Sequence, residues 1–191
     1  MIEQLVQWDI AFFLSLNKWH SPLWDQVMWF ISAKESWYPV YAVILFFIFR
    51  KQKYYGFVTL VFIALLITLA DQLSVHAFKE VFERLRPCHT PQLQGLVHTV
   101  NGKCGGQYGF VSSHASNFFA LATFLAFYFQ RRYLSMLFFI LAAIVGYSRI
   151  YLGVHFPLDV ICGGLLGVTV GVLVNTLYQY TLKRVRNKFG N

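Results

Sequence analysis

The stretch GFVTLVFIALLITLADQLSV, residues 56–75, decides the fold because it is 20 residues long and apolar along almost its whole length. A helix needs about 20 apolar residues to cross a bilayer. Lipid offers no hydrogen-bond partners to an open backbone, so a chain segment within the bilayer must form a helix or a closed barrel. We therefore expect this stretch to be a membrane-spanning helix.

Four further apolar runs predict the rest of the architecture, at residues 37–49, 115–129, 134–147 and 158–178. With the first run they predict an all-α integral membrane helical bundle of about five transmembrane helices, formed by a single membrane-embedded domain over residues 1–191. The composition agrees, because only 13% of the residues are charged and 57% are hydrophobic. A soluble domain carries about 25% charged residues.

The N-terminal region, residues 1–36, has a different pattern. All five tryptophans lie within the first 37 residues, and apolar residues recur at roughly helical spacing from Leu5 to Leu14. Tryptophan favours the headgroup level of a bilayer, and amphipathic helices lie in that plane. We predict interfacial helices here. The alternative is that part of this region inserts as a hairpin or as an extra span, which would raise the number of transmembrane helices to six.

The net charge of +8 comes from basic residues in small groups between apolar runs, a distribution that argues against nucleic acid as a partner. Nine of the 16 Lys and Arg residues lie at residues 50–53, at residues 131–132 and in the tail, residues 183–191. The positive-inside rule marks these segments as cytoplasmic. Residues 1–36, 79–112 and 149–157 are then outside, which is the periplasmic side of a bacterial-type inner membrane. This side also carries Lys79, Arg84, Arg86 and Arg149, a basic excess that topology does not explain.

The outer connection at residues 79–112 begins with two cations, Lys79 and Arg86, followed by Pro87. The cations are seven residues apart, a spacing that predicts one face of a helix, and Pro87 is expected to end that helix. Two cations on one face at the membrane surface suit a phosphate group. Snorkelling of both side chains to lipid headgroups is the alternative.

A second cluster, Ser112, Ser113 and His114, runs directly into the apolar residues 115–129. Ser112 has the character of a helix N-cap, and the free N–H groups of a first helical turn bind anions. His114 lies in that turn, where a proton donor could reach a bound phosphate. The alternative is a histidine at the membrane surface without a role.

A third cluster contains Arg149, His155, Pro157 and Asp159. A helix is expected to end near Arg149 and another to begin near Pro157. His155 and Asp159 are four residues apart, so the carboxylate could hold one ring nitrogen and leave the other free as a nucleophile. A purely structural His–Asp pair is the alternative. Because all three clusters fall on the outer side, we expect them to converge on one pocket.

Together the three clusters resemble the type 2 phosphatidic acid phosphatase superfamily, whose signature also occurs in vanadium haloperoxidases. The family pattern is Lys-x6-Arg-Pro, then Pro-Ser-Gly-His, then Ser-Arg-x5-His-x3-Asp. The first motif is complete here, the third is complete from Ser148 to Asp159, and the second carries Val111 and Ser113 where the family has Pro and Gly. The resemblance covers about residues 79–159. Haloperoxidases are soluble, so the apolar runs favour the lipid phosphatase branch.

The resemblance implies a phosphatase that works through a phosphohistidine intermediate without a metal ion or other cofactor. His155 would attack phosphorus, Asp159 would orient it, and His114 would protonate the leaving oxygen. If Ser113 is helical it keeps its N–H group, so activity is expected to survive with a changed pocket. The implied phosphate-binding residues are Lys79, Arg86, Ser112, Ser113 and Arg149.

The family also implies the partners, which are membrane lipids and a lipid phosphate substrate. Candidate substrates are undecaprenyl diphosphate, phosphatidylglycerol phosphate and lipid A phosphate. The alternatives are an inactive relative that binds lipid phosphates, which the intact motif residues disfavour, and a lipid carrier, which the few short spans disfavour. The sequence leaves the oligomeric state open, because Gly163, Gly167 and Gly171 suit close helix packing within one chain or between two.

Two of the three cysteines, Cys88 and Cys104, lie in the outer connection. A loop that faces an oxidising compartment favours a disulfide, so we predict a Cys88–Cys104 bond. Cys162 lies within an apolar run and is expected to serve packing alone. The loop histidines His89 and His98 are expected to be solvated.

Overall fold

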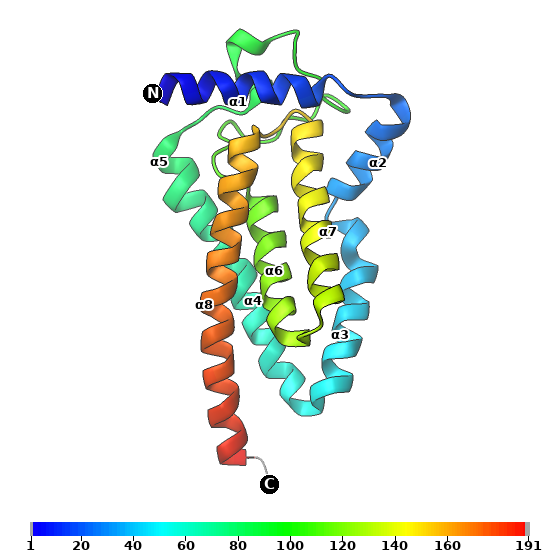
Figure 1. Ribbon diagram of the computed structural model, residues 1–191, viewed down its shortest axis with the longest axis vertical. Coiled ribbons are helices and arrows are strands. Elements are labelled where there is room, and N and C mark those ends of the chain that lie inside the picture. Colours follow the sequence, from blue (N-terminus) through cyan, green and yellow to red (C-terminus); the bar gives the residue numbers. More distant parts are fainter. Residues whose placement is uncertain (1, 190–191) are drawn as a thin grey trace.

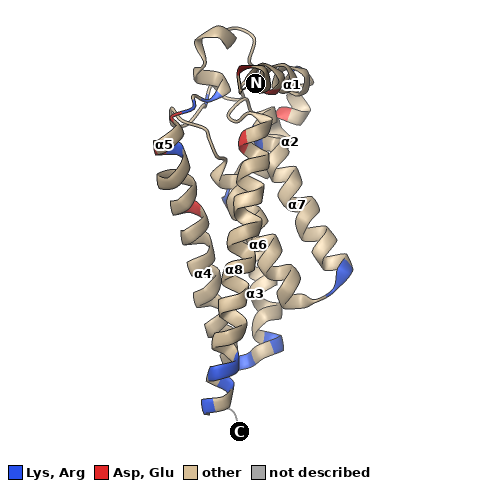
Figure 2. Cartoon of the chain, turned by 60° about the vertical axis from the view of Figure 1, so that its left-hand side comes forward, with Lys and Arg blue, Asp and Glu red and all other residues tan. Residues whose placement is uncertain are grey.

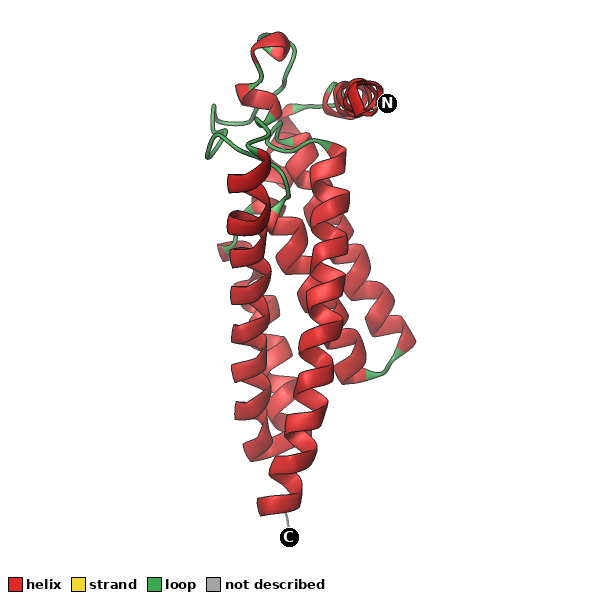
Figure 3. Ribbon diagram, turned by 90° about the vertical axis from the view of Figure 1, so that its left-hand side faces the viewer, coloured by secondary structure: helices red, strands yellow, loops and turns green. Residues whose placement is uncertain are grey.

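The computed structural model describes residues 2–189 as a bundle of long helices (Figures 1 and 3). The described residues contain no strand, so the expected all-α membrane bundle is confirmed. The five long helices coincide with the five apolar runs: α3 (Tyr38–Gln52), α4 (Gly56–Gln72), α6 (Ser113–Phe129), α7 (Arg132–Tyr151) and α8 (Pro157–Phe189).

Three helical segments within residues 2–189 are long and apolar enough to cross a membrane: Glu35–Phe82, Arg132–Tyr151 and Pro157–Lys188. The first contains two helices, α3 and α4, because the chain reverses between them at Lys53, which has a φ of 47°. α6 has 17 residues and is enclosed by its neighbours. The membrane-embedded helical bundle is confirmed, and the number of spans stays a prediction.

The N-terminal region forms α1 (Ile2–Asn17) and α2 (Pro22–Ser32). α1 lies across one end of the bundle, and α2 descends beside α7 (Figure 1). The buried face of α1 consists of Asp9, Phe13 and Asn17, while most of its apolar side chains point outward. An orientation across the bundle supports the interfacial prediction over an added span.

The glycine stripe of α8 packs against α6 in the centre of the bundle. A Cβ added to Gly163 would lie 2.5 Å from the Ser112 carbonyl oxygen, and one added to Gly171 would lie 2.6 Å from Cβ of Thr123. Gly167 faces the backbone of α6 in the same way. The small residues therefore serve close packing within one chain.

Basic side chains gather at the end of the bundle that holds the α3–α4 and α6–α7 turns and the C-terminal part of α8 (Figure 2). The predicted basic tail, residues 183–191, continues α8 as far as Phe189, and residues 190–191 lie outside the described part. α1 and the long connection between α5 and α6 lie at the opposite end (Figure 1). The separation of the two ends agrees with the charge pattern from which the topology was predicted.

The chain after the second apolar run differs from its prediction. α4 continues through a π-helical stretch, η3 (Leu73–Lys79), into α5 (Glu80–Phe82). The outer loop predicted for residues 79–112 therefore begins only at Glu83, whose left-handed φ of 45° ends the helix. π-Helical segments are rare and often mark functional sites.

Lys79 and Arg86 do not share a helical face, so that prediction is wrong. Lys79 is helical, whereas Arg86 follows in an extended segment that pairs with a later part of the loop. The Arg86 N–H donates to the Gln107 carbonyl at 3.1 Å, and the Gly109 N–H donates to the Arg84 carbonyl at 2.8 Å. These long-range backbone bonds replace the helical ones that local spacing suggested.

Candidate active site

A tight loop between α7 and α8 positions His155. α7 ends at Tyr151 and α8 begins at Pro157, close to the predicted boundaries. Gly153 has a φ of 72°, and a Cβ there would lie 2.5 Å from a neighbouring carbonyl oxygen, so only glycine fits. The N–H groups of Val154 and His155 donate to the Arg149 carbonyl at 3.1 and 3.3 Å. These bonds fix a histidine that is only 1% exposed.

The two ring nitrogens of His155 face different charges. Nδ1 lies 3.5 Å from Oδ2 of Asp159, and Nε2 lies 3.5 Å from Nη1 of Arg86. The expected hydrogen bond from His155 to Asp159 is therefore not formed at this distance, and Oδ2 accepts the Phe156 N–H at 2.9 Å instead. Catalytic hydrogen bonds are often long in ligand-free structures and shorten when substrate binds.

Arg84 is a site residue to which sequence reasoning gave no role. Its Nη1 donates to Oδ1 of Asp159 at 2.7 Å, and its Nη2 donates to Oδ2 of Asp9 at 2.6 Å. Oδ1 of Asp9 also accepts the Leu158 N–H at 3.0 Å. Burial raises the pKa of Asp9, and the hydrogen bond from Arg84 acts against that rise. α1 is thus tied to the loop that carries His155.

A signal for this pair was present in the sequence. Asp9 is an acidic residue between Trp8 and Ile10 in the apolar pattern of α1, and a buried carboxylate requires a cation or several hydrogen bonds. Arg84 belongs to the excess of basic residues on the outer side that topology did not explain. Nothing local to either residue identified the other, because they are 75 positions apart.

Arg86 is held against the loop beside His155. Its Nε donates to the Tyr108 carbonyl at 3.2 Å, and its Nη1 donates to the Val154 carbonyl at 3.4 Å. A Cβ on the neighbouring Gly109 would lie 3.1 Å from Oδ2 of Asp159 and 3.2 Å from Cγ of Arg86. A glycine at this position therefore lets Arg86 and Asp159 approach each other around His155.

Lys79 meets the start of α6 directly. Its Nζ donates to Oγ of Ser113 at 2.5 Å, and that hydroxyl lies 2.6 Å from Oγ of Ser74. Ser112 caps the helix, with its Oγ accepting the Ala115 N–H at 3.4 Å and its own N–H bound to the Asp159 carbonyl. Ser112 therefore holds the first turn of α6 in place, whereas the side chain of Ser113 meets the predicted phosphate ligand Lys79.

The remaining predicted residues, Arg149 and His114, lie in the same neighbourhood. Nη1 of Arg149 donates to the hydroxyl of Ser32 on α2, and its buried Nε has no partner among the described residues. The charges of Arg149 and Lys79 act on both His114 and His155. The structure thus brings two imidazoles and three cations, supplied by three separate motifs, together at one end of the bundle.

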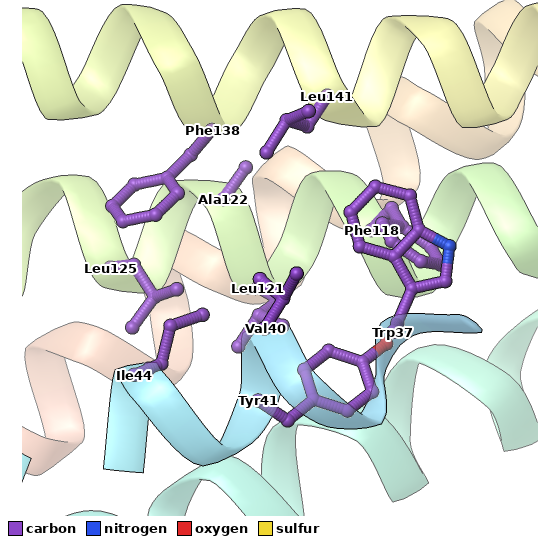
Figure 4. Close-up of a pocket in the computed structure, with 10 residues that line it drawn as sticks. All are labelled: Trp37, Val40, Tyr41, Ile44, Phe118, Leu121, Ala122, Leu125, Phe138 and Leu141. Atoms are coloured by element: carbon purple, nitrogen blue, oxygen red, sulfur yellow. The ribbon is translucent and has the colours of Figure 1, made fainter. Parts of the chain in front are cut away.

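A cavity of about 470 Å³ opens from this point between α3, α4 and α6. Its polar lining is Lys34, Asp71, Ser113, His114 and Asn117. Below these residues the lining is mostly aliphatic and aromatic, and includes Ile44, Leu45, Ile63, Ile67, Phe118 and Leu121. A small apolar pocket on the far side of α3, between α3, α6 and α7, shares Tyr41, Ile44, Phe118 and Leu121 with this cavity (Figure 4).

The pKa of His155 is lowered well below its ordinary value of 6.5, first by burial and then by the charges of Arg86 and Arg149. The neutral imidazole, which is the nucleophilic form, therefore persists as the pH falls through 6.5 and is lost only at the lowered pKa. We expect an NMR titration of the ring carbons, assigned with a His155→Asn variant, to place the His155 midpoint below 6.5. A midpoint at or above 6.5 would contradict this electrostatic description.

The loop next to the site contains the Cys88–Cys104 disulfide, with a Cα–Cα distance of 6.0 Å, and Cys162 is free. His89 lies close to both sulfur atoms, but sulfurs joined in a disulfide are not thiolate ligands for a metal. The prediction that His98 is solvated is wrong. Its Nε2 bonds to Oδ1 of Asp25 at 2.9 Å, because α1 and α2 fold over this part of the loop.

The disulfide leads to a labelling prediction. Protein purified without reductant and denatured in detergent is expected to react with one equivalent of a thiol reagent, at Cys162, and with three equivalents after reduction. Mass spectrometry of the labelled chain measures both values, and a Cys162→Ser variant should take up no label before reduction. Labelling of Cys88 or Cys104 before reduction would contradict the bond.

Comparisons with known proteins show the family of this chain. The sequence profile of the PAP2 superfamily matches residues 60–183. A lipid A 4′-phosphatase of Porphyromonas gingivalis is 38% identical over 96% of this chain and 78% of its own length. A lipid A 4′-phosphatase of Bacteroides thetaiotaomicron is 39% identical over 87% of this chain and 75% of its own length.

A solved structure of a PAP2-type phosphatase is also similar to this chain. The crystal structure of a transmembrane PAP2-type phosphatidylglycerolphosphate phosphatase from Bacillus subtilis matches with a TM-score of 0.69 and 26% identity, over 93% of this chain and 87% of that one. The chain belongs to the PAP2 superfamily. It is a membrane lipid phosphatase of the PAP2 type.

Proposed function

We propose that this phosphatase removes the terminal phosphate of a lipid phosphate through a phosphohistidine on His155, without a metal ion, at the periplasmic face of a bacterial inner membrane. The observation that supports the proposal is the meeting of two imidazoles and three cations from three chain segments above a largely apolar cavity. The concentration of basic turns at the other end of the bundle supports the orientation (Figure 2).

Three cationic side chains bind the phosphate. Lys79, Arg86 and Arg149 hold the non-bridging oxygens and stabilise the charge that develops in the transition state. Arg86 lies beside Nε2 of His155, so a phosphate bound to it would have its phosphorus next to that nitrogen. Arg86 is buried and Lys79 and Arg149 are half-buried, so water screens their charges less than it screens those of exposed residues.

The chemistry proceeds in two steps. In the first, Nε2 of His155 forms a bond to phosphorus, the bond from phosphorus to the lipid oxygen breaks, and His114 gives that oxygen a proton. Asp159, facing Nδ1, stabilises the positive charge that forms on the ring. In the second step water attacks the phosphohistidine, His114 takes the proton from that water, and inorganic phosphate leaves.

The substrate we propose is lipid A phosphate, one of three candidates that family resemblance offered. Two relatives with about two-fifths identity carry the name lipid A 4′-phosphatase. Phosphatidylglycerol phosphate is the next candidate, on the name of the structural neighbour. Undecaprenyl diphosphate is the third candidate substrate.

The test is phosphate release from these three lipids in detergent micelles, with and without EDTA. We expect release from lipid A phosphate at the highest kcat/KM, unchanged by EDTA, because side-chain cations occupy the positions that a metal ion would take. Protein carrying His155→Ala provides the blank. Loss of activity in EDTA that Mg²⁺ restores would overturn the metal-free mechanism, and no release from any lipid would overturn the proposed function.

A further inference from the structure

The cavity wall carries two polar side chains that the phosphatase reaction does not use, Asp71 and Asn117. We propose that they form a recognition site for hydrogen-bond donors on the leaving alcohol. The ligand they suit is an acylated sugar, whose hydroxyl and amide N–H groups carry no charge. This inference rests on the proposed function, because it concerns the same cavity and the same reaction.

The position of the pair follows from the two helices that carry it. Asp71 precedes Ser74 by three residues on α4, and Asn117 follows Ser113 by four residues on α6. Ser74 and Ser113 touch at 2.6 Å. Residues three or four apart share a helix face and are separated by about 5–6 Å along the axis. Asp71 and Asn117 therefore line the cavity about one turn below the contact between Ser113 and Lys79.

Both side chains offer unused acceptors. Oδ1 of Asn117 is buried and has no hydrogen-bond partner among the described residues. The carboxylate of Asp71 makes no hydrogen bond or ion pair within residues 2–189, although its charge acts on Lys79. A buried acceptor without a donor costs free energy, so a ligand that supplies O–H or N–H groups gains affinity here.

The same two residues disfavour the other candidate lipids. In a polyprenyl diphosphate the leaving group keeps a phosphate, which would approach the negative charge of Asp71, and a hydrocarbon chain follows with no donor for Asn117. The phosphodiester of phosphatidylglycerol phosphate likewise places an anion in this region. Lys34, which also lines the cavity, is exposed, so water screens its charge more than that of the half-buried Asp71.

The lower cavity fits the rest of such a ligand. Below Asp71 and Asn117 its wall is apolar, with Ile63, Ile67 and Leu121 among the lining residues. Its volume of about 470 Å³ lies within the range of about 300–1,000 Å³ that is common for ligand sites. An acyl chain attached to the sugar would continue from the polar pair into this space.

The test compares two lipids with the full-length protein: an acylated disaccharide carrying one phosphate monoester, and undecaprenyl diphosphate. The measured quantity is the ratio of their kcat/KM values. Asn117→Leu and Asp71→Leu are each expected to lower this ratio about 10- to 100-fold, the loss associated with an unpaired polar contact. Asn175→Leu is the matched control, because Asn175 also has a buried, unpartnered Oδ1 but does not line the cavity.

The outcomes separate the two proposals. A fall of the ratio in either variant, with Asn175→Leu at the native ratio, supports the inference, so misfolding of one variant leaves the other decisive. A native ratio in the folded variants, or a wild-type preference for undecaprenyl diphosphate, would overturn the inference and leave the phosphatase intact. Absence of phosphate release from both lipids by the wild type would overturn the proposed function and this inference together.

Discussion

Replacement of His155 by alanine is expected to lower kcat by at least about 10³-fold, because the variant has no nitrogen to accept the phosphoryl group. The surrounding cations remain and still bind phosphate, so KM should change far less than kcat. The side chain is 1% exposed and its ring forms no strong hydrogen bond, so the loss of packing is the main structural cost. Steady-state phosphate release measures both constants.

The matched control for this variant is His76→Ala. His76 lies in the same outer half of the bundle, on η3, but it is exposed and bonds only to Glu80 and Gln72. We expect that variant to keep the native kcat. Native kcat in folded His155→Ala protein would mean that another group attacks phosphorus.

Replacement of Arg84 by methionine is expected to have the second-largest effect. It leaves the carboxylates of Asp9 and Asp159 buried without the cation that bridges them, and removing one partner of a buried ion pair costs about 3–5 kcal/mol. The freed Asp159 loses its fixed position beside Nδ1 of His155. We expect kcat to fall about 10²-fold or more with KM nearly unchanged, because Arg84 binds no phosphate in this mechanism.

Two further variants separate the effect of the Arg84 charge from the effect of its geometry between the two carboxylates. Arg84→Lys keeps the charge but lacks the planar fork that reaches both carboxylates, so it should restore only part of kcat. Asp9→Asn removes only the partner on α1. Its main expected effect is a lower thermal midpoint of unfolding, with a smaller effect on kcat. A raised KM with native kcat in Arg84→Met protein would instead assign Arg84 to substrate binding.

The sequence was sufficient for the fold because the bilayer restricts the choices. An apolar run such as residues 56–75 can only be a helix there, and each of the five runs became one. The boundaries around Pro157 followed from local rules in the same way. Prediction was weaker at residues 83–86, because the helix ends at Glu83 and backbone pairing of residues 84–86 with residues 107–109 replaces its expected last turn.

The candidate site was predicted only in part, for a related reason. Residues with fixed motif spacing, such as His155 and Asp159, are visible in a single segment. Arg84 and Asp9 are not, because their bond joins positions far apart in the chain. Asp71 is the one charged residue of the apolar run at residues 56–75, and the role we propose for it depends on a cavity that only the packed helices create.

The most direct measurement is rapid-quench labelling with a lipid whose terminal phosphate carries ³²P. The mechanism predicts that label appears on the protein within one turnover, is stable in base and labile in acid, and maps to a peptide that contains His155. It also predicts no label in His155→Ala protein. Label on a different residue, or full turnover by the wild type with no protein-bound phosphate at any time, would contradict a histidine nucleophile.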